Sequence, residues 1–130
     1  MNRQIQVSPS GGVVTVKLIV AIIQPTKLKV VQEALAHVSV ERMTVCDALG
    51  YARQRGRTEM YRGHEYEQTL LRKVVLEIVV NDDFLTRTLD ILQDVARTGA
   101  EGTIGDGKVF VLPVEQAYQI GGTASGPEAV

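Results

Sequence analysis

The chain has 130 residues, of which 45% are hydrophobic and 22% charged, and its formal net charge is −1. This composition is typical of one soluble globular domain, and the near-neutral charge argues against general electrostatic binding to nucleic acid or an anionic membrane. A single cysteine, Cys46, excludes a disulfide within the chain, and the longest apolar runs are too short to span a bilayer. We therefore expect a cytoplasmic protein with no membrane insertion and no nucleic-acid partner.

The first half of the chain predicts a strand, a helix and a second strand. Residues 1–12 end in a Ser/Pro/Gly cluster and are expected to form a flexible leader before a domain that spans 13–120. Residues 13–23 are apolar and β-prone, and Gln24-Pro25-Thr26 ends that strand. Apolar residues then recur at helical spacing from Leu28 to Val38. A second strand is expected at 42–49, with Cys46 buried in it as a small hydrophobic residue.

The second half repeats the pattern. Residues 73–80 predict a strand, and Asp82 or Asp83 is expected to cap a helix whose apolar side runs from Leu85 to Val95. A further strand at 108–112 and a short extension at 116–120 precede a Gly-rich tail, 121–130, which is expected to be flexible. Two β-α-β units predict an α+β, ferredoxin-like βαββαβ fold, with both helices on one face of an antiparallel sheet.

A glycine-rich stretch at 98–108 joins the second helix to the last strand. Its four glycines allow positive φ, so that successive N–H groups can converge on an anion, and Lys108 adds a positive charge. Valine follows Gly-Lys where a Walker A loop has Ser or Thr. The stretch is therefore either a phosphate-binding loop of another kind or an ordinary turn.

A long insertion at 50–72 separates the two units. It carries three of the four tyrosines and five arginines, a composition suited to contact with a protein or an anion. The alternative is a solvated hairpin without a partner, and composition does not separate the two interpretations.

Several motifs, taken in order, resemble the PII signal-transduction family over residues 16–120. The motifs are Ala21-Ile22-Ile23-Gln24-Pro25 with Lys27-Leu28, Met43-Thr44-Val45, Gly50-Tyr51-Ala52-Arg53-Gln54-Arg55-Gly56, Glu59-Met60-Tyr61-Arg62-Gly63-His64-Glu65-Tyr66, and Ile104-Gly105-Asp106-Gly107-Lys108. The resemblance implies a homotrimer with ATP or ADP bound in clefts between subunits. It also implies a T-loop at about 51–72 that docks onto a target protein, and a B-loop at about 98–108.

The resemblance also assigns roles to single residues. It implies phosphate contacts from the B-loop and contacts to the adenine and ribose from the sheet. Gln54 is expected to help ligate Mg²⁺ bound with ATP, and Lys73 to pair with a carboxylate of 2-oxoglutarate. Tyr66 is a candidate for modification, whereas His64 stands where some members carry a phosphorylatable serine. The implied nucleotide-binding residues are Thr44, Glu77, Val79, Thr98, Gly105, Asp106, Gly107 and Lys108.

Two departures from the family pattern affect the expected ligand. Residues 100–103 lengthen the B-loop and bring in Glu101, and Gln119 and Gly121 replace two arginines. We therefore expect weaker or altered nucleotide binding, shifted toward ADP or AMP, and an alternative function as a carbon-linked sensor that responds to bicarbonate. A regulatory module without enzymatic activity is favoured over a slow nucleotide phosphatase, for which Glu101 is the only nearby general-base candidate.

Overall fold

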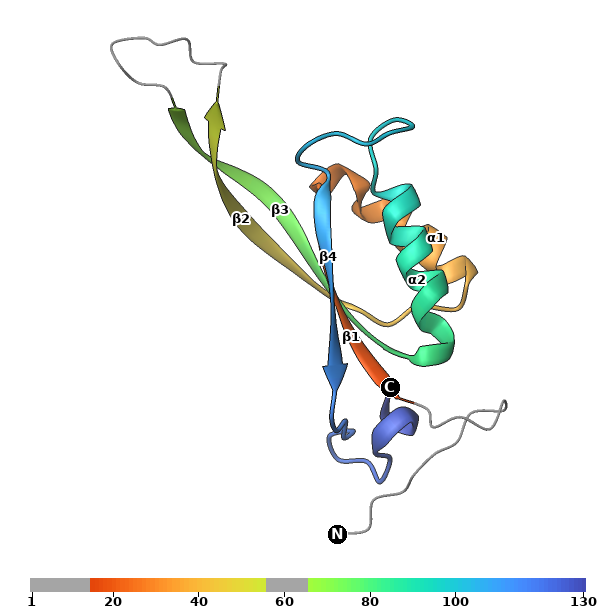
Figure 1. Ribbon diagram of the computed structural model, residues 1–130. Coiled ribbons are helices and arrows are strands. Elements are labelled where there is room, and N and C mark those ends of the chain that lie inside the picture. Colours follow the sequence, from red (N-terminus) through yellow and green to blue (C-terminus); the bar gives the residue numbers. More distant parts are fainter. Residues whose placement is uncertain (1–14, 56–65) are drawn as a thin grey trace.

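The computed structural model describes residues 15–55 and 66–130, and its fold is the α+β, ferredoxin-like arrangement expected from the sequence. Four antiparallel strands form one sheet in the order β2-β3-β1-β4 (Figure 1). Within the described ranges, no helix combines the length and apolar character that a membrane span requires. The elements are β1 (Val16–Ile23), η1 (Pro25–Lys27), α1 (Leu28–His37), β2 (Thr44–Arg55), β3 (Tyr66–Asn81), α2 (Asp82–Val95), β4 (Gly107–Val114) and η2 (Gly126–Ala129).

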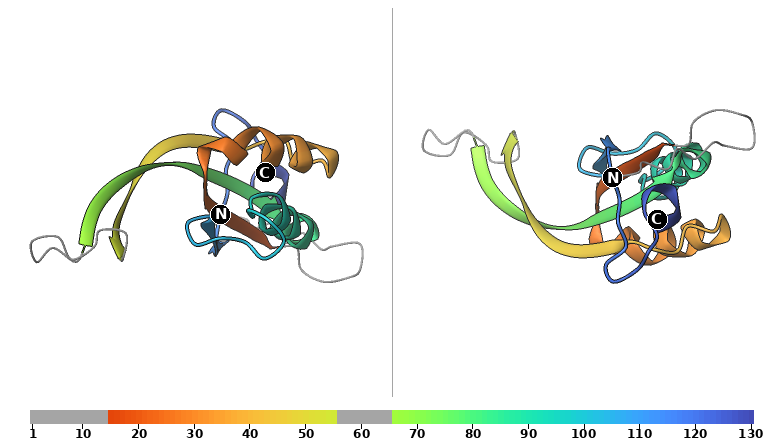
Figure 2. Two further views of the ribbon diagram at one scale, coloured as in Figure 1. Left: turned by 90° about the horizontal axis from the view of Figure 1, so that it is seen from above. Right: turned by 90° about the horizontal axis from the view of Figure 1, so that it is seen from below.

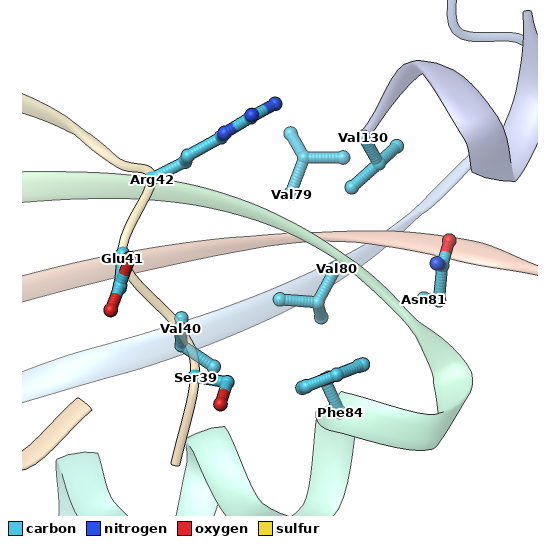
Figure 3. A pocket seen from close by; sticks show the side chains of 9 residues that line it. All are labelled: Ser39, Val40, Glu41, Arg42, Val79, Val80, Asn81, Phe84 and Val130. Carbon is cyan, nitrogen blue, oxygen red and sulfur yellow. The ribbon is translucent and has the colours of Figure 1, made fainter. Parts of the chain in front are cut away.

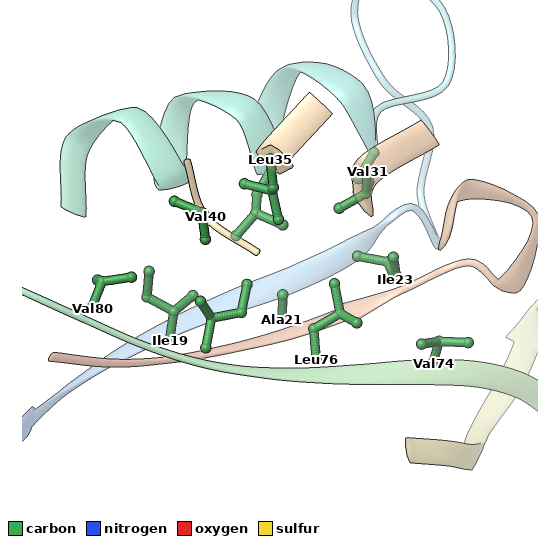
Figure 4. Packing of buried hydrophobic residues seen from close by; sticks show 12 residues of the cluster. Ile19, Ala21, Ile23, Val31, Leu35, Val40, Val74, Leu76 and Val80 are labelled. Atoms are coloured by element: carbon green, nitrogen blue, oxygen red, sulfur yellow. The ribbon is translucent and has the colours of Figure 1, made fainter. Parts of the chain in front are cut away.

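Both helices cover the same face of the sheet, and the core lies between these two layers (Figures 1 and 2). Alternate residues of the central strands point toward the helices, as the twofold repeat of a strand requires; Ile19 and Ile78 are fully buried there. Helix α1 contributes Val31 and Leu35 to the same cluster (Figure 4). Leu92 of α2 also belongs to it, and each of the three is at most 1% exposed. Among the described residues, neither α1 nor α2 lies over the opposite face of the sheet, which we name the outer face.

The strands β2 and β3 are longer than the sequence predicts, and much of the expected loop at 51–72 is a two-stranded ribbon. The ladder continues from Thr44↔Glu77 to Arg55↔Tyr66, and the ribbon leaves the body of the domain (Figure 1). The prediction ended the second strand before Gly50, which is wrong. A Cβ at Gly50 would lie 3.3 Å from Cγ of Lys73, so glycine leaves room for that side chain across the ladder. The tip at 56–65, with Tyr61 and His64, lies outside the described residues, as does the predicted leader.

Two local predictions are corrected. Cys46 is exposed, because it lies opposite Val75 on the outer face rather than under the helices. The N-cap of α2 is Asn81, and Asp82 begins the helix. The carboxylate of Asp82 accepts hydrogen bonds from the N–H and hydroxyl of Thr15, and these contacts lower its pKa.

The residues after β4 contain local contacts and a short helix, and the flexibility of the tail at 121–130 stays a prediction. No strand forms at 116–120; instead Tyr118 and Ser125 form an isolated bridge, and the Gly126 N–H donates to the Ala117 carbonyl at 2.7 Å. The short helix η2 follows, and Val130 lies beside the end of β3 (Figure 3). This folding back depends on Gly126, whose φ is +63°.

Candidate functional site

The loop between α2 and β4 is organised around one carboxylate. Asp106 accepts hydrogen bonds from the Thr98 hydroxyl at 2.6 Å, the Thr98 N–H at 2.8 Å and the Thr103 N–H at 2.7 Å. The Thr98 hydroxyl, and after it the two N–H groups, hold the pKa of Asp106 below its usual value of 3.8. Asp106 therefore stays ionised at neutral pH, and its carboxylate is hydrogen-bonded to groups of its own loop.

The inserted residues at 100–103 fold against Arg97. The Arg97 Nε donates to the Gly99 carbonyl at 3.1 Å, and Gly102 lies so close that a Cβ there would be 3.2 Å from Cγ of Arg97. Thr103, also in the inserted stretch, supplies one of the donors to Asp106. The insertion thus takes part in the loop's internal hydrogen bonding, and Glu101 is left exposed.

Two glycines at the loop's exit have positive φ, and a side chain would meet different surroundings at each of them. Gly107, at φ +134°, lies against β1, and a Cβ there would overlap the Ile22 carbonyl oxygen and lie 3.0 Å from the carbonyl carbon. Gly105, at φ +99°, would place a Cβ in open space, with nothing within 4 Å. Gly105 is therefore a position where a ligand can approach the backbone closely.

Positive side chains surround this loop. The Lys73 Nζ donates to the Gly105 carbonyl at 2.9 Å, and the Lys27 Nζ donates to the Arg97 carbonyl at 3.2 Å. Lys108 is exposed on β4 immediately after Gly107. A loop with open glycines and nearby ammonium groups suits an anion such as phosphate.

The loop also borders a hollow of about 850 Å³ beneath the end of α2. Its floor includes Ile23, Leu92 and Val109, and its rim includes Arg97 and Glu101. The five loop residues predicted to contact phosphate, from Thr98 to Lys108, therefore lie together, and Lys73 lies beside them.

The three other predicted nucleotide residues lie elsewhere on the sheet. Thr44 pairs with Glu77 on the outer face, and Val79 lies two residues farther along the same face. Glu77 pairs with Val20, which lies three residues before the end of β1. At a rise of about 3.3 Å per residue, Glu77 therefore lies about 10 Å along the sheet from the end of β1, where the glycine loop joins β4. Val79 lines a smaller pocket of about 220 Å³ together with Arg42 (Figure 3). One chain thus holds the predicted residues in two separate groups.

The ribbon carries two further predicted residues at its far end. Gln54 pairs with Glu67 and Tyr66 pairs with Arg55, which fixes their backbone positions in the ladder. Both lie several residues beyond Lys73, which pairs with Ala48. The backbone of one chain does not bring Gln54 next to the glycine loop, so a shared ligand site for Gln54 and this loop remains a prediction.

Sequence reasoning missed a residue immediately after β1 that contacts the glycine loop. The Gln24 Nε2 lies 3.2 Å from Oδ1 of Asp106 and 3.4 Å from the Gly105 carbonyl oxygen. The available signal was its place immediately after a strand and before Pro25, where the backbone is restricted to extended conformations.

Comparison with known proteins identifies the class. The family model described as nitrogen regulatory protein P-II matches residues 16–123. Nitrogen regulatory protein GlnK1 of Methanosarcina mazei is 41% identical over 117 residues, 90% of this chain and 99% of that protein. Nitrogen regulatory protein P-II of Azospirillum brasilense is 45% identical over 114 residues, 88% of this chain and 99% of that protein.

Solved structures agree with this result. The structure of the B. subtilis GlnK–ATP complex has a TM-score of 0.74 and 26% sequence identity, and the match covers 89% of this chain and 98% of that one. The fold and the sequence relatives together define a regulatory protein rather than a general ferredoxin-like domain. The chain belongs to the nitrogen regulatory protein P-II family.

Proposed function

We propose that this protein binds an adenine nucleotide with its phosphates at the glycine loop, and that nucleotide and metabolite together control a partner protein through the ribbon. The observation that carries the proposal is the loop itself. Its one internal carboxylate, Asp106, is held by three donors within the loop, while Lys73 donates to the Gly105 carbonyl and Lys108 follows at the loop's exit. The similarity to a GlnK–ATP complex supports ATP or ADP as the ligand class.

The residues present suit a nucleotide. Gly105 leaves the backbone open to close approach, and the ammonium groups supply charge that a phosphate chain requires. Bound nucleotide would supply phosphate oxygens for Mg²⁺, and Gln54 would add an amide oxygen. Lys73 would hold a carboxylate of 2-oxoglutarate, or bicarbonate in the alternative carbon-linked role.

The assembly in this proposal is a homotrimer with each nucleotide held between two subunits. Phe110 and Leu112 are 49% and 43% exposed on the outer face, and Val79 is 38% exposed there, so this face is available to a second copy. The two groups of predicted residues, about 10 Å apart along β1, would then belong to opposite walls of one cleft. The expected mass in solution is three times the 14.2 kDa of one chain.

The residues after β4 affect which adenine nucleotide the protein is expected to prefer. Within one chain, β4 separates the glycine loop from Gln119 by more than seven residues, about 23 Å at 3.3 Å per residue. Gln119 and Gly121 would therefore reach a nucleotide only from a neighbouring subunit, and neither carries the positive charge of arginine. Together with exposed Glu101 on the rim of the hollow, this supports a shift toward ADP or AMP.

The ribbon supports a role in partner binding. Leu49, Tyr51 and Leu70 are 60–65% exposed on it, and exposed apolar residues on a projecting element are suited to contact with another protein. The proposed partner is a transporter or a metabolic or regulatory enzyme, and Tyr66, at the far end of the ribbon, is the candidate for modification.

Mixed trimers test the shared cleft. Lys108→Ala removes charge from the loop wall, and Glu77→Ala changes the other wall, so each variant alone should bind ADP weakly. Co-expressed and mixed at random, about a quarter of the clefts would combine the two intact walls and regain wild-type affinity. Binding that stays weak in the mixture would contradict a cleft between subunits.

A further inference from the structure

We propose that Gln24 is a positioning residue for the glycine loop: its side-chain amide donates hydrogen bonds to two electronegative groups and holds them away from the phosphate that they would otherwise repel. This inference rests on the proposed function. The two groups are the Asp106 carboxylate, 3.2 Å from Nε2, and the Gly105 carbonyl oxygen, 3.4 Å from the same atom. Both are acceptors, so the atom facing them is the amide nitrogen, whose two hydrogens match the two oxygens.

The backbone fixes where Gln24 stands. Ile23 pairs with Gly107 as the last step of the ladder between β1 and β4, so Gln24 follows directly opposite Asp106. Pro25 restricts the residue before it to extended conformations, and Gln24 has φ −70° and ψ 138°. The side chain is therefore held at the strand's end, beside the loop rather than in solvent.

The contacts of Gln24 complete the restraint on one peptide group of the loop. The Gly105 carbonyl accepts from Lys73 Nζ at 2.9 Å as well as from Gln24, and the Asp106 N–H donates to the Thr103 carbonyl at 3.1 Å. Both ends of the peptide between Gly105 and Asp106 are thus occupied. Its oxygen is turned toward Lys73 and Gln24, while the Cα of Gly105 remains open to a ligand.

Removing the amide should weaken nucleotide binding without unfolding the domain. Gln24→Met keeps the length and shape of the side chain but removes both donors, one of them to a charged acceptor. We expect the dissociation constant for ADP, measured by calorimetry, to rise about ten-fold. The matched control is Gln32→Met on the exposed side of α1, which makes no side-chain hydrogen bond within the described region and should change the constant less than about two-fold.

Gln24→Glu distinguishes positioning from simple packing. It places a carboxylate against two acceptors, so at pH 7.5 it should bind ADP more weakly than Gln24→Met. The charged groups that face this position are Asp106, Lys73 at the Gly105 carbonyl, and Lys27, whose charge acts on Asp106. Repulsion by Asp106 favours protonation of the introduced carboxyl. The affinity of the Gln24→Glu variant for ADP, relative to that of wild type, should therefore recover as the pH falls to 5.5.

A second readout needs no nucleotide. Amide hydrogen exchange at Thr98 and Thr103, whose N–H groups donate to Asp106, should become faster in Gln24→Met, while the urea midpoint stays near that of wild type. Unchanged exchange, or an affinity ratio for Gln24→Glu that does not depend on pH, would overturn the inference. If wild-type protein bound no adenine nucleotide, the proposed function would fail, and exchange would still decide whether Gln24 orders the loop.

Discussion

Gly107→Ala should be one of the most damaging single substitutions in the loop, because the Cα of this residue lies against the backbone of β1. A Cβ would overlap the Ile22 carbonyl oxygen and would lie 3.0 Å from the carbonyl carbon and 3.3 Å from Cα of Ile23. These are backbone atoms of a central strand, so relief requires the strands to separate. Overpacking of this kind costs about 1–3 kcal/mol, and holding alanine at φ +134° adds about 1–3 kcal/mol. We expect a total loss of about 2–6 kcal/mol in the free energy of unfolding.

Gly99→Ala is the matched control for this prediction. Its φ is +70° and a Cβ would meet nothing within 4 Å, so it carries the backbone strain alone, about 1–2 kcal/mol. Both variants are unfolded in urea and followed by circular dichroism at one fixed subunit concentration, because assembly shifts apparent stability by mass action. Equal urea midpoints for the two variants would refute the argument that contact with β1, rather than φ, requires glycine at position 107.

Three further predictions follow from the core, the carboxylate at the loop's centre and the insertion. Ile78→Ala should lower the free energy of unfolding by about 2–5 kcal/mol, whereas Val30→Ala, at an exposed position on α1, should change it by less than about 0.5 kcal/mol. The pKa of Asp106 is lowered on folding, so its contribution is present above pH 3.8 and lost as the pH falls below it; the gap in urea midpoint between wild type and Asp106→Asn should therefore shrink below that pH, and a constant gap would contradict this. Glu101→Gln should tighten ADP binding in calorimetry by removing like charge near the phosphates, whereas loss of a nucleotide-hydrolysing activity in this variant would favour the phosphatase alternative.

Much of the fold follows from short-range patterns in the sequence. The apolar, β-prone runs at 13–23 and 73–80 predicted β1 and β3, and the helical spacing of Val31 and Leu35 predicted α1 and its apolar side. The extent of the ribbon did not follow, because Gly50 is a local stop signal whose role depends on Lys73, a neighbour across the ladder. The exposure of Cys46 depended on which face of the sheet lacks helices.

The candidate site, like the fold, could be predicted from the sequence only in part. The glycine loop was visible as a contiguous motif, and the structure shows its predicted residues together around Asp106. The role of Asp106 as an internal acceptor was not visible, since its partners at Thr98 and Thr103 depend on the loop's path. Gln24 lies 82 residues from Asp106 in the chain, and only the pairing of β1 with β4 brings them together.

A calorimetric titration of the wild-type protein and Lys108→Ala with ATP, ADP and AMP tests the central claim most directly. Each nucleotide is titrated with and without Mg²⁺, and 2-oxoglutarate and bicarbonate are then added to the saturated protein. The account predicts saturable binding of up to one nucleotide per chain, with the affinity at least about ten-fold weaker in Lys108→Ala. Absence of binding by all three nucleotides, or equal affinity in Lys108→Ala, would contradict a phosphate site at the glycine loop.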